Sequence, residues 1–188
     1  VEASFESFTT TKTFREAVTP FLTDEEQEVF IHSYDTVGSI AIIQVPDELA
    51  EKEDTIGQAL LDAQPSIRTV RSRNTERGGQ QRLRTTKHLA GEDTTKTVHV
   101  EHGVELVVDV DAVYFSPRLS TERARIANMV EAGEDVLVMF SGCAPYPCVI
   151  AEKSEARSIT GVEINNAGHR LGVENVGRNG FENRVSLH

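Results

Sequence analysis

The segment EDVLVMFSGCAPYPCVIAEKS, residues 134–154, decides the fold class. It begins with an apolar run of the kind found in strands that are buried in a parallel sheet. The loop SGCAP follows at 141–145, and the remaining residues have the composition of a short helix. The next apolar stretch, RSITGVEI at 157–164, predicts a second strand. A second helix is expected over 165–180, where a glycine ends the pattern.

A strand, a loop, a helix and a second strand ending in an acid together form the first half of a nucleotide-binding α/β unit. Glycine in the loop, here Gly142, lets the backbone approach a ligand closely. An acid after the second strand, here Glu163, can accept both hydroxyl protons of a ribose. The alternative is that Glu163 is an ordinary acid exposed to solvent. A single loop of this kind is also only a weak sequence signal for a cofactor site.

The residues before this unit predict a different organisation. Apolar spacing over 119–132 indicates an amphipathic helix, and the turn-forming stretch YFSPRLSTER at 114–123 overlaps its start. Further upstream we expect a strand over 38–45, a helix over 46–63 and a hairpin over 94–110. The first part of the chain is therefore expected to be a mixed α+β domain.

The charge distribution bears on possible partners. The net charge of −11 argues against a uniformly phosphate-binding surface, but the arginines cluster over 68–84 and 118–125. The protein can thus be acidic overall and basic locally. Excess Asp and Glu with few Lys is also what we expect of a halophilic protein, in which surface charge keeps the molecule hydrated.

Several classes of protein are not expected from this composition. The two cysteines, Cys143 and Cys148, are interpreted as reduced core thiols, and the histidines have no ligand spacing, so no metal is expected. Neither a run of 18 apolar residues nor a secretory leader is visible in the sequence, so we expect a cytoplasmic protein without a membrane partner.

Four pieces of the sequence carry a family resemblance: RLRTTKHLAGE at 82–92, YFSPRLSTER at 114–123, GVEIN at 161–165 and NVGRNG at 175–180. Together they resemble the archaeal and eukaryotic tRNA (guanine-37, N1)-methyltransferase family. The resemblance implies a class I enzyme in which S-adenosylmethionine donates a methyl group to N1 of the guanosine beside the anticodon. The implied partner is the anticodon loop of tRNA, and we expect a monomer.

The implied fold is mixed α/β. An α+β tRNA-recognition domain over 1–112 would precede a Rossmann-like methyltransferase domain over 113–188. Because the chain begins with Val and ends within a strand-like segment, we expect a fragment that lacks the C-terminal half of its sheet.

The resemblance also implies catalytic roles. Guanine N1 carries a proton at neutral pH, so its methylation needs a base for that proton and a cation for the charge on O6. By similarity, Glu122 is the general base and Arg82 stabilises O6, with Arg84 the neighbour that could take this role instead. Tyr114 would position the target base. Without the resemblance, Glu122 could equally form a surface pair with Arg118 at the i,i+4 spacing.

The remaining site residues follow from the same resemblance. Those expected to bind the cofactor are Phe140, Gly142 and Glu163. Those expected to contact RNA are Arg84, Arg118 and Arg123, of which the last two could instead order the start of the helix.

Two departures from the family pattern leave other functions open. Val138 stands where the family has an acid, and Ala144 stands where it has a glycine, which puts cofactor affinity in doubt. One alternative is the related transferase that moves the aminocarboxypropyl group of the same cofactor in wybutosine synthesis. The other is a non-catalytic RNA-binding module.

Overall fold

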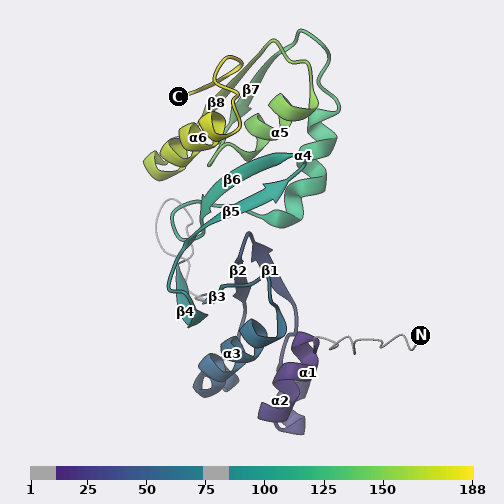
Figure 1. The fold of residues 1–188 in the computed structure, drawn as a ribbon, viewed down its shortest axis with the longest axis vertical. Helices are drawn as coiled ribbons and strands as arrows, with labels where there is room; N and C mark the ends of the chain where they lie inside the picture. The colour runs from purple at the N-terminus through teal and green to yellow at the C-terminus, as the bar shows by residue number, and fades with distance from the viewer. Residues whose placement is uncertain (1–11, 74–84) are drawn as a thin grey trace, which may run out of the picture.

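The computed structural model describes residues 12–73 and 85–188 (Figure 1). The expected site residues Arg82 and Arg84 lie outside the described residues. In the described part, two groups of elements follow one another along the chain, and each has its own hydrophobic core. The mixed α/β fold class is confirmed.

The N-terminal group is a four-stranded sheet with helices. Its sheet has the strand order β1-β2-β3-β4, with β2 and β3 parallel and the other two pairs antiparallel. Its elements are α1 (Phe14–Val18), η1 (Thr19–Phe21), α2 (Asp24–Val29), β1 (Tyr34–Val37), β2 (Ile40–Ile43), η2 (Asp47–Lys52), α3 (Glu53–Ala63), β3 (Thr69–Arg73) and β4 (Thr86–Gly91).

Local sequence explains these elements. Thr13 and Thr23 each form a capping box with the glutamate three residues later, which starts α1 and α2. The strand β2 is made of Ile and Ala, and the side chains of Ala41 and Ile43 enter the same core as those of Leu49, Ile56 and Leu60. The predicted strand over 38–45 and helix over 46–63 are confirmed, except that the helix begins as a 3-10 segment.

The C-terminal group contains a hairpin, helices and a parallel sheet of three strands in the order β7-β8-β9. Its elements are β5 (Lys96–Glu101), β6 (Val104–Asp109), η3 (Pro117–Leu119), α4 (Ser120–Ala127), β7 (Asp135–Met139), α5 (Pro145–Lys153), β8 (Ser158–Val162), α6 (Asn166–Arg178) and β9 (Val185–Leu187). The predicted hairpin, the two strands and their helices are confirmed.

One detail differs from the sequence predictions. The helix α4 ends at Ala127 rather than near Gly133. The backbone N–H groups of Met129 and Val130 donate to carbonyls three residues earlier, as in a 3-10 helix, instead of continuing the α-helical pattern. Within the described residues β7 has a neighbouring strand, β8, on one side only. Leu137 of β7 is 63% exposed.

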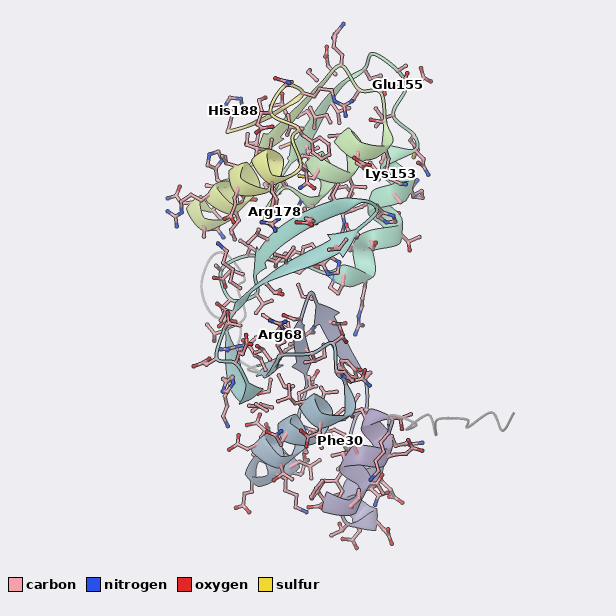
Figure 2. The ribbon with its side chains drawn as sticks, in the orientation of Figure 1. Phe30, Arg68, Lys153, Glu155, Arg178 and His188 are labelled. Carbon is pink, nitrogen blue, oxygen red and sulfur yellow. The ribbon has the colours of Figure 1, made fainter. Side chains whose placement is uncertain are left out.

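Apart from Val37 of β1, the buried residues of the C-terminal core lie after β4, and those of the other core lie before β5. The predicted domain boundary at residue 112 falls after the hairpin β5–β6, whereas Val104, Leu106 and Val108 of this hairpin pack into the C-terminal core. Figure 1 shows the hairpin lying between the N-terminal sheet and the helices α5 and α6, while Phe30 lies in the other core (Figure 2).

The two groups meet where the turn between β1 and β2 packs on β5. Gly38 has φ +53, and a Cβ at this position would lie 2.3 Å from both Oγ1 of Thr97 and the carbonyl oxygen of Val98. The backbone N–H of Ser39 donates to Thr97 Oγ1 at 3.0 Å. Only glycine therefore allows the turn to approach the hairpin this closely.

On the other side of the hairpin, the Asn175 side chain forms hydrogen bonds that connect α6 to the hairpin and to the loop after β7. Its side chain is fully buried. The amide oxygen accepts from Val107 N–H at 2.7 Å, and Nδ2 donates to the carbonyls of Val107 at 3.1 Å and Cys143 at 2.8 Å. Cys143 lies in the loop after β7, so Asn175 connects that loop to the hairpin.

We expect Asn175→Asp to destabilise the fold by about 2–4 kcal/mol, because a carboxylate cannot donate to the Val107 and Cys143 carbonyls and is itself buried. Urea unfolding of the two proteins measures the difference. Asn166→Asp, an exposed position on the same helix, is the matched control and should change stability by less than about 0.5 kcal/mol. An equal effect at both positions would contradict this account of Asn175.

No helix within residues 12–73 and 85–188 is long and apolar enough to cross a membrane.

Candidate active site

The loop after β7 has an unusual backbone. Phe140, Gly142 and Ala144 all have left-handed conformations, with φ of 56, 57 and 63°. Ala144 begins α5, and Pro145 occupies the first position of that helix. Left-handed residues other than glycine are uncommon and cluster at functional sites. The loop lies at the carboxyl end of β7, where open α/β sheets bind their ligands.

Glu163, just after β8, is hydrogen-bonded to this loop. Its Oε2 accepts from Gly142 N–H at 2.7 Å, and its Oε1 accepts from Asn165 N–H at 2.7 Å. Gly168 lies close by, since a Cβ there would be 3.2 Å from Cγ of Glu163 and 3.4 Å from the Gly142 backbone. Glu163 is therefore a fixed, half-buried group and not a freely solvated acid. Each of its oxygens keeps a lone pair for a further donor.

The segment that contains Tyr114 lies beside the same loop. The Tyr114 carbonyl oxygen is 3.8 Å from the position of a Cβ on Gly142, and its side chain is 73% exposed. Asn165 Nδ2 donates to the carbonyl of Ala112 at 2.9 Å. The structure thus brings Tyr114 together with Gly142 and Glu163. Asn165 was missed in the sequence, because its role depends on a contact 53 residues away.

Glu122 lies in the first turn of α4, and its side chain is 41% exposed. Both carboxylate oxygens accept from Arg125, at 2.8 and 2.7 Å. The hydrogen bonds from Arg125, together with its positive charge, lower the pKa of Glu122 from its usual value. The surface pair that we considered for Glu122 thus forms with Arg125 and not with Arg118. Its carboxylate is ionised at neutral pH and therefore able to accept a proton.

Arg118 joins the turn before α4 to the N-terminal sheet. Its Nε donates to Oδ1 of Asp35 at 2.6 Å, while Oδ2 of Asp35 accepts from Arg73. Asp35 is largely buried between these two guanidinium groups, whereas the Arg118 side chain is 70% exposed. Arg118 is consequently available to a partner in solution.

Arg123 does not face solvent, contrary to what contact with RNA phosphate requires. The residue is 1% exposed, and its guanidinium forms two hydrogen bonds to Glu101, at 2.5 and 2.7 Å. A third bond joins Nη2 to the carbonyl of Ser116 at 3.2 Å. Of the two roles expected for Arg123, the structure favours ordering the start of the helix. Glu101 lies on β5, 22 residues earlier in the chain, so no local sequence pattern indicated this pair.

Glu101 is strongly perturbed by its surroundings. Burial by itself raises the pKa of Glu101, but hydrogen bonds from His99 and Arg123 and the charge of Arg123 outweigh it and lower the pKa to about 2. A carboxyl group with a lowered pKa stabilises the fold fully above its unfolded-state pKa, and this contribution is lost as the pH falls toward the folded-state value.

Glu101→Gln should therefore flatten the decline in stability between pH 4.5 and about 2. Urea midpoints measured across this range for both proteins test the expectation, because the other carboxylates contribute equally to each. If the two curves remain parallel, the Glu101 carboxylate is not held in its ionised form by Arg123.

Thr86, at the start of β4, is hydrogen-bonded to Asp111, which precedes the Tyr114 segment. Oδ1 of Asp111 accepts from the N–H of Thr86 at 3.0 Å and from its hydroxyl at 2.7 Å. Arg71 Nε donates to the same hydroxyl at 2.6 Å. These bonds fix Thr86, two residues after Arg84, beside a residue that lies three positions before Tyr114.

Other reactive groups take no part in the site. Burial raises the pKa of both Cys143 and Cys148 to about 12, so neither thiol is ionised at neutral pH. Within the part of the chain that the structure describes, no group of three or more His, Cys, Asp or Glu side chains could hold a metal ion.

Comparisons with known proteins identify the family of this chain. Residues 97–188 match the model of the TRM5/TYW2 methyltransferase domain, and residues 14–94 match that of the TYW2 N-terminal domain. A curated relative, the tRNA (guanine(37)-N(1))-methyltransferase Trm5b of Pyrococcus abyssi, is 37% identical over 155 residues, which are 82% of this chain and 46% of the relative. The chain belongs to the tRNA (guanine-37, N1)-methyltransferase family.

Solved structures of this family and of the related TYW2 proteins share the fold. The complex of aTrm5 with tRNALeu is 35% identical, with a TM-score of 0.85 over 96% of this chain and 54% of that chain. TYW2 of P. horikoshii, solved in complex with MeSAdo, is 26% identical, with a TM-score of 0.74 over 93% of this chain and 61% of that chain. The chain spans about half the length of the curated relatives it matches first.

Proposed function

We propose that this protein methylates N1 of guanosine 37 in tRNA with S-adenosylmethionine as the methyl donor. The observation that carries the proposal is the position of the Tyr114 segment beside the loop of Gly142, to which Glu163 is hydrogen-bonded. The Tyr114 segment would hold the acceptor base, and the loop of Gly142 would hold the methyl donor. Their adjacent positions suit transfer of a group between two bound molecules.

The residues present fit such a donor. Glu163 is held by two backbone N–H groups and keeps lone pairs that can accept ribose hydroxyls. Apart from the Tyr114 carbonyl, no described atom beyond the neighbouring residues would lie within 4 Å of a Cβ on Gly142, so a ligand can approach its backbone. Phe140 is 82% exposed at the same loop and offers an apolar surface. When bound, S-adenosylmethionine supplies a methyl group activated by a sulfonium.

The reaction itself needs little from the protein besides position and charge. Glu122 removes the N1 proton of guanine as the methyl group arrives. The pair with Arg125 lowers the pKa of Glu122, which makes its carboxylate a weaker base while the pair is intact. To reach the base, the carboxylate must give up part of its contact with Arg125. Arg82 stabilises the charge on O6, with Arg84 as the alternative, and Tyr114 positions the base.

The N-terminal group, residues 12–94, is proposed to recognise tRNA. Support comes from the related complex of aTrm5 with tRNALeu. Arg118 is the described arginine proposed to contact RNA phosphate, because it is exposed at the junction of the two groups. Arg123 is left out of this role because its guanidinium is buried.

A second candidate is transfer of the aminocarboxypropyl group from the same cofactor. The match of residues 14–94 to the TYW2 N-terminal domain favours it. The higher identity to Trm5b and aTrm5 than to the TYW2 structure favours methylation.

Two labelled donors distinguish these reactions. The intact protein is incubated with tRNA transcripts that carry G37 or A37 and with tRNA that carries the modified guanosine of wybutosine synthesis at position 37, each with S-adenosylmethionine labelled either in the methyl carbon or in the carboxyl carbon. We expect only the methyl label to enter RNA, and only with G37. Incorporation of the carboxyl label would establish the second candidate, and transfer of neither label would overturn both.

A further inference from the structure

A buried cluster of polar side chains lies where the N-terminal sheet, the hairpin and the Tyr114 segment meet. His99 of β5 is at its centre. The imidazole Nδ1 accepts from the N–H of Gly38 at 3.2 Å, and Nε2 lies 3.5 Å from Oε2 of Glu101. The ring also contacts the edge of Phe115, with ring centroids 5.0 Å apart.

These contacts determine the tautomer of His99. Because Nδ1 accepts a hydrogen bond from a backbone N–H, the proton of the neutral ring is on Nε2. Nε2 is the atom that faces Glu101. One ring thus joins the turn at Gly38, in the N-terminal group, to the carboxylate that holds Arg123.

Arg123 extends the same chain of contacts toward the donor-side loop. Its guanidinium lies 5.1 Å from the centre of the Phe115 ring and 6.0 Å from that of Tyr146. Tyr146 is in the first turn of α5, directly after the loop with left-handed residues. Arg123 also donates to the Ser116 carbonyl, two residues from Tyr114, and is itself adjacent to Glu122.

We propose that His99 and Glu101 are positioning residues for methyl transfer. They transmit the position of the N-terminal group, through Arg123, to the segment that carries Tyr114 and Glu122. Neither side chain needs to touch substrate or cofactor in this role. The proposal rests on the function proposed above.

The geometry gives this arrangement a specific consequence. Glu101 and Arg123 are both almost fully buried, so their charges are fixed by each other and not by solvent. Changing His99 removes the link to Gly38, and changing Glu101 releases Arg123. Since both changes interrupt one chain of contacts, their effects on turnover should not add.

The test uses His99→Gln, Glu101→Gln and the double variant of the intact protein. Glutamine at 99 keeps a donor for Glu101 but loses the acceptor for Gly38. We expect each single change to lower kcat with tRNA roughly tenfold, which corresponds to about 1.4 kcal/mol. The double variant should be no slower than the slower single variant, and the Kd for S-adenosylmethionine should stay within about twofold of wild type. His88→Gln on β4 is the matched control.

Three outcomes would overturn the proposal: wild-type kcat in His99→Gln, additive losses in the double variant, or a loss of cofactor affinity in parallel with turnover. Hydrogen exchange of residues 114–123 gives a readout that needs no activity. We expect faster exchange there in His99→Gln than in wild type or His88→Gln. An unchanged exchange rate overturns the proposal. If exchange is faster in His99→Gln but the wild-type protein methylates no tRNA, only the proposed function is refuted.

Discussion

Glu122→Gln is expected to lower kcat for methyl transfer by about 10²–10⁴-fold, the usual contribution of a positioned general base. Glutamine has the shape of glutamate and can still accept from Arg125, but it cannot take a proton from guanine N1. Affinity for S-adenosylmethionine should be unchanged. Single-turnover methylation of a G37 transcript measures the effect.

The control for this experiment is Glu131→Gln, which changes an exposed acid after the end of α4. It should leave kcat unchanged. If Glu122→Gln transfers methyl groups at the wild-type rate, Glu122 is only the surface partner of Arg125, and another group must remove the proton.

Arg123→Met is expected to destabilise the protein by about 3–5 kcal/mol, because it leaves the Glu101 carboxylate buried without its partner. The double variant Glu101→Leu with Arg123→Met should recover most of this stability, since replacing both members of a buried pair by apolar groups is often neutral. Urea unfolding measures both variants.

Arg178→Met (Arg178 is labelled in Figure 2) is the matched control, because Arg178 pairs with Glu105 at 2.7 Å while the side chains are 40% and 51% exposed. Its loss should cost less than about 1 kcal/mol. Equal losses for Arg178→Met and Arg123→Met would contradict a special role for the buried pair.

The contact between Gly142 and Glu163 could be predicted from the sequence because its signals are local. A strand, a glycine loop and an acid after the next strand follow one another within 30 residues, and their order alone places Gly142 near Glu163. The family motif YFSPRLSTER likewise indicated that Tyr114 belongs to a site. Its position beside Gly142 came only from the structure.

The supporting contacts could not be predicted, because they join residues far apart in the chain. In the sequence, Arg123 is one of several clustered arginines, and only the fold shows that its guanidinium is hydrogen-bonded to the Glu101 carboxylate. Asn175 resembled an ordinary polar helix residue, although it bonds to the hairpin 68 residues earlier. The packing of the hairpin on the C-terminal core, too, depends on tertiary contacts and not on strand patterns.

The central claim is that the loop with Phe140 and Gly142, together with Glu163 after β8, forms the methyl-donor site, and calorimetric titration of S-adenosylmethionine tests it most directly. Wild type and Glu163→Ala are compared in high salt, with Glu155→Ala, an exposed acid between α5 and β8, as the control (Figure 2). We predict saturable binding to wild type and Glu155→Ala that is lost in Glu163→Ala. Absence of binding to wild type, or equal affinity in Glu163→Ala, would contradict the account.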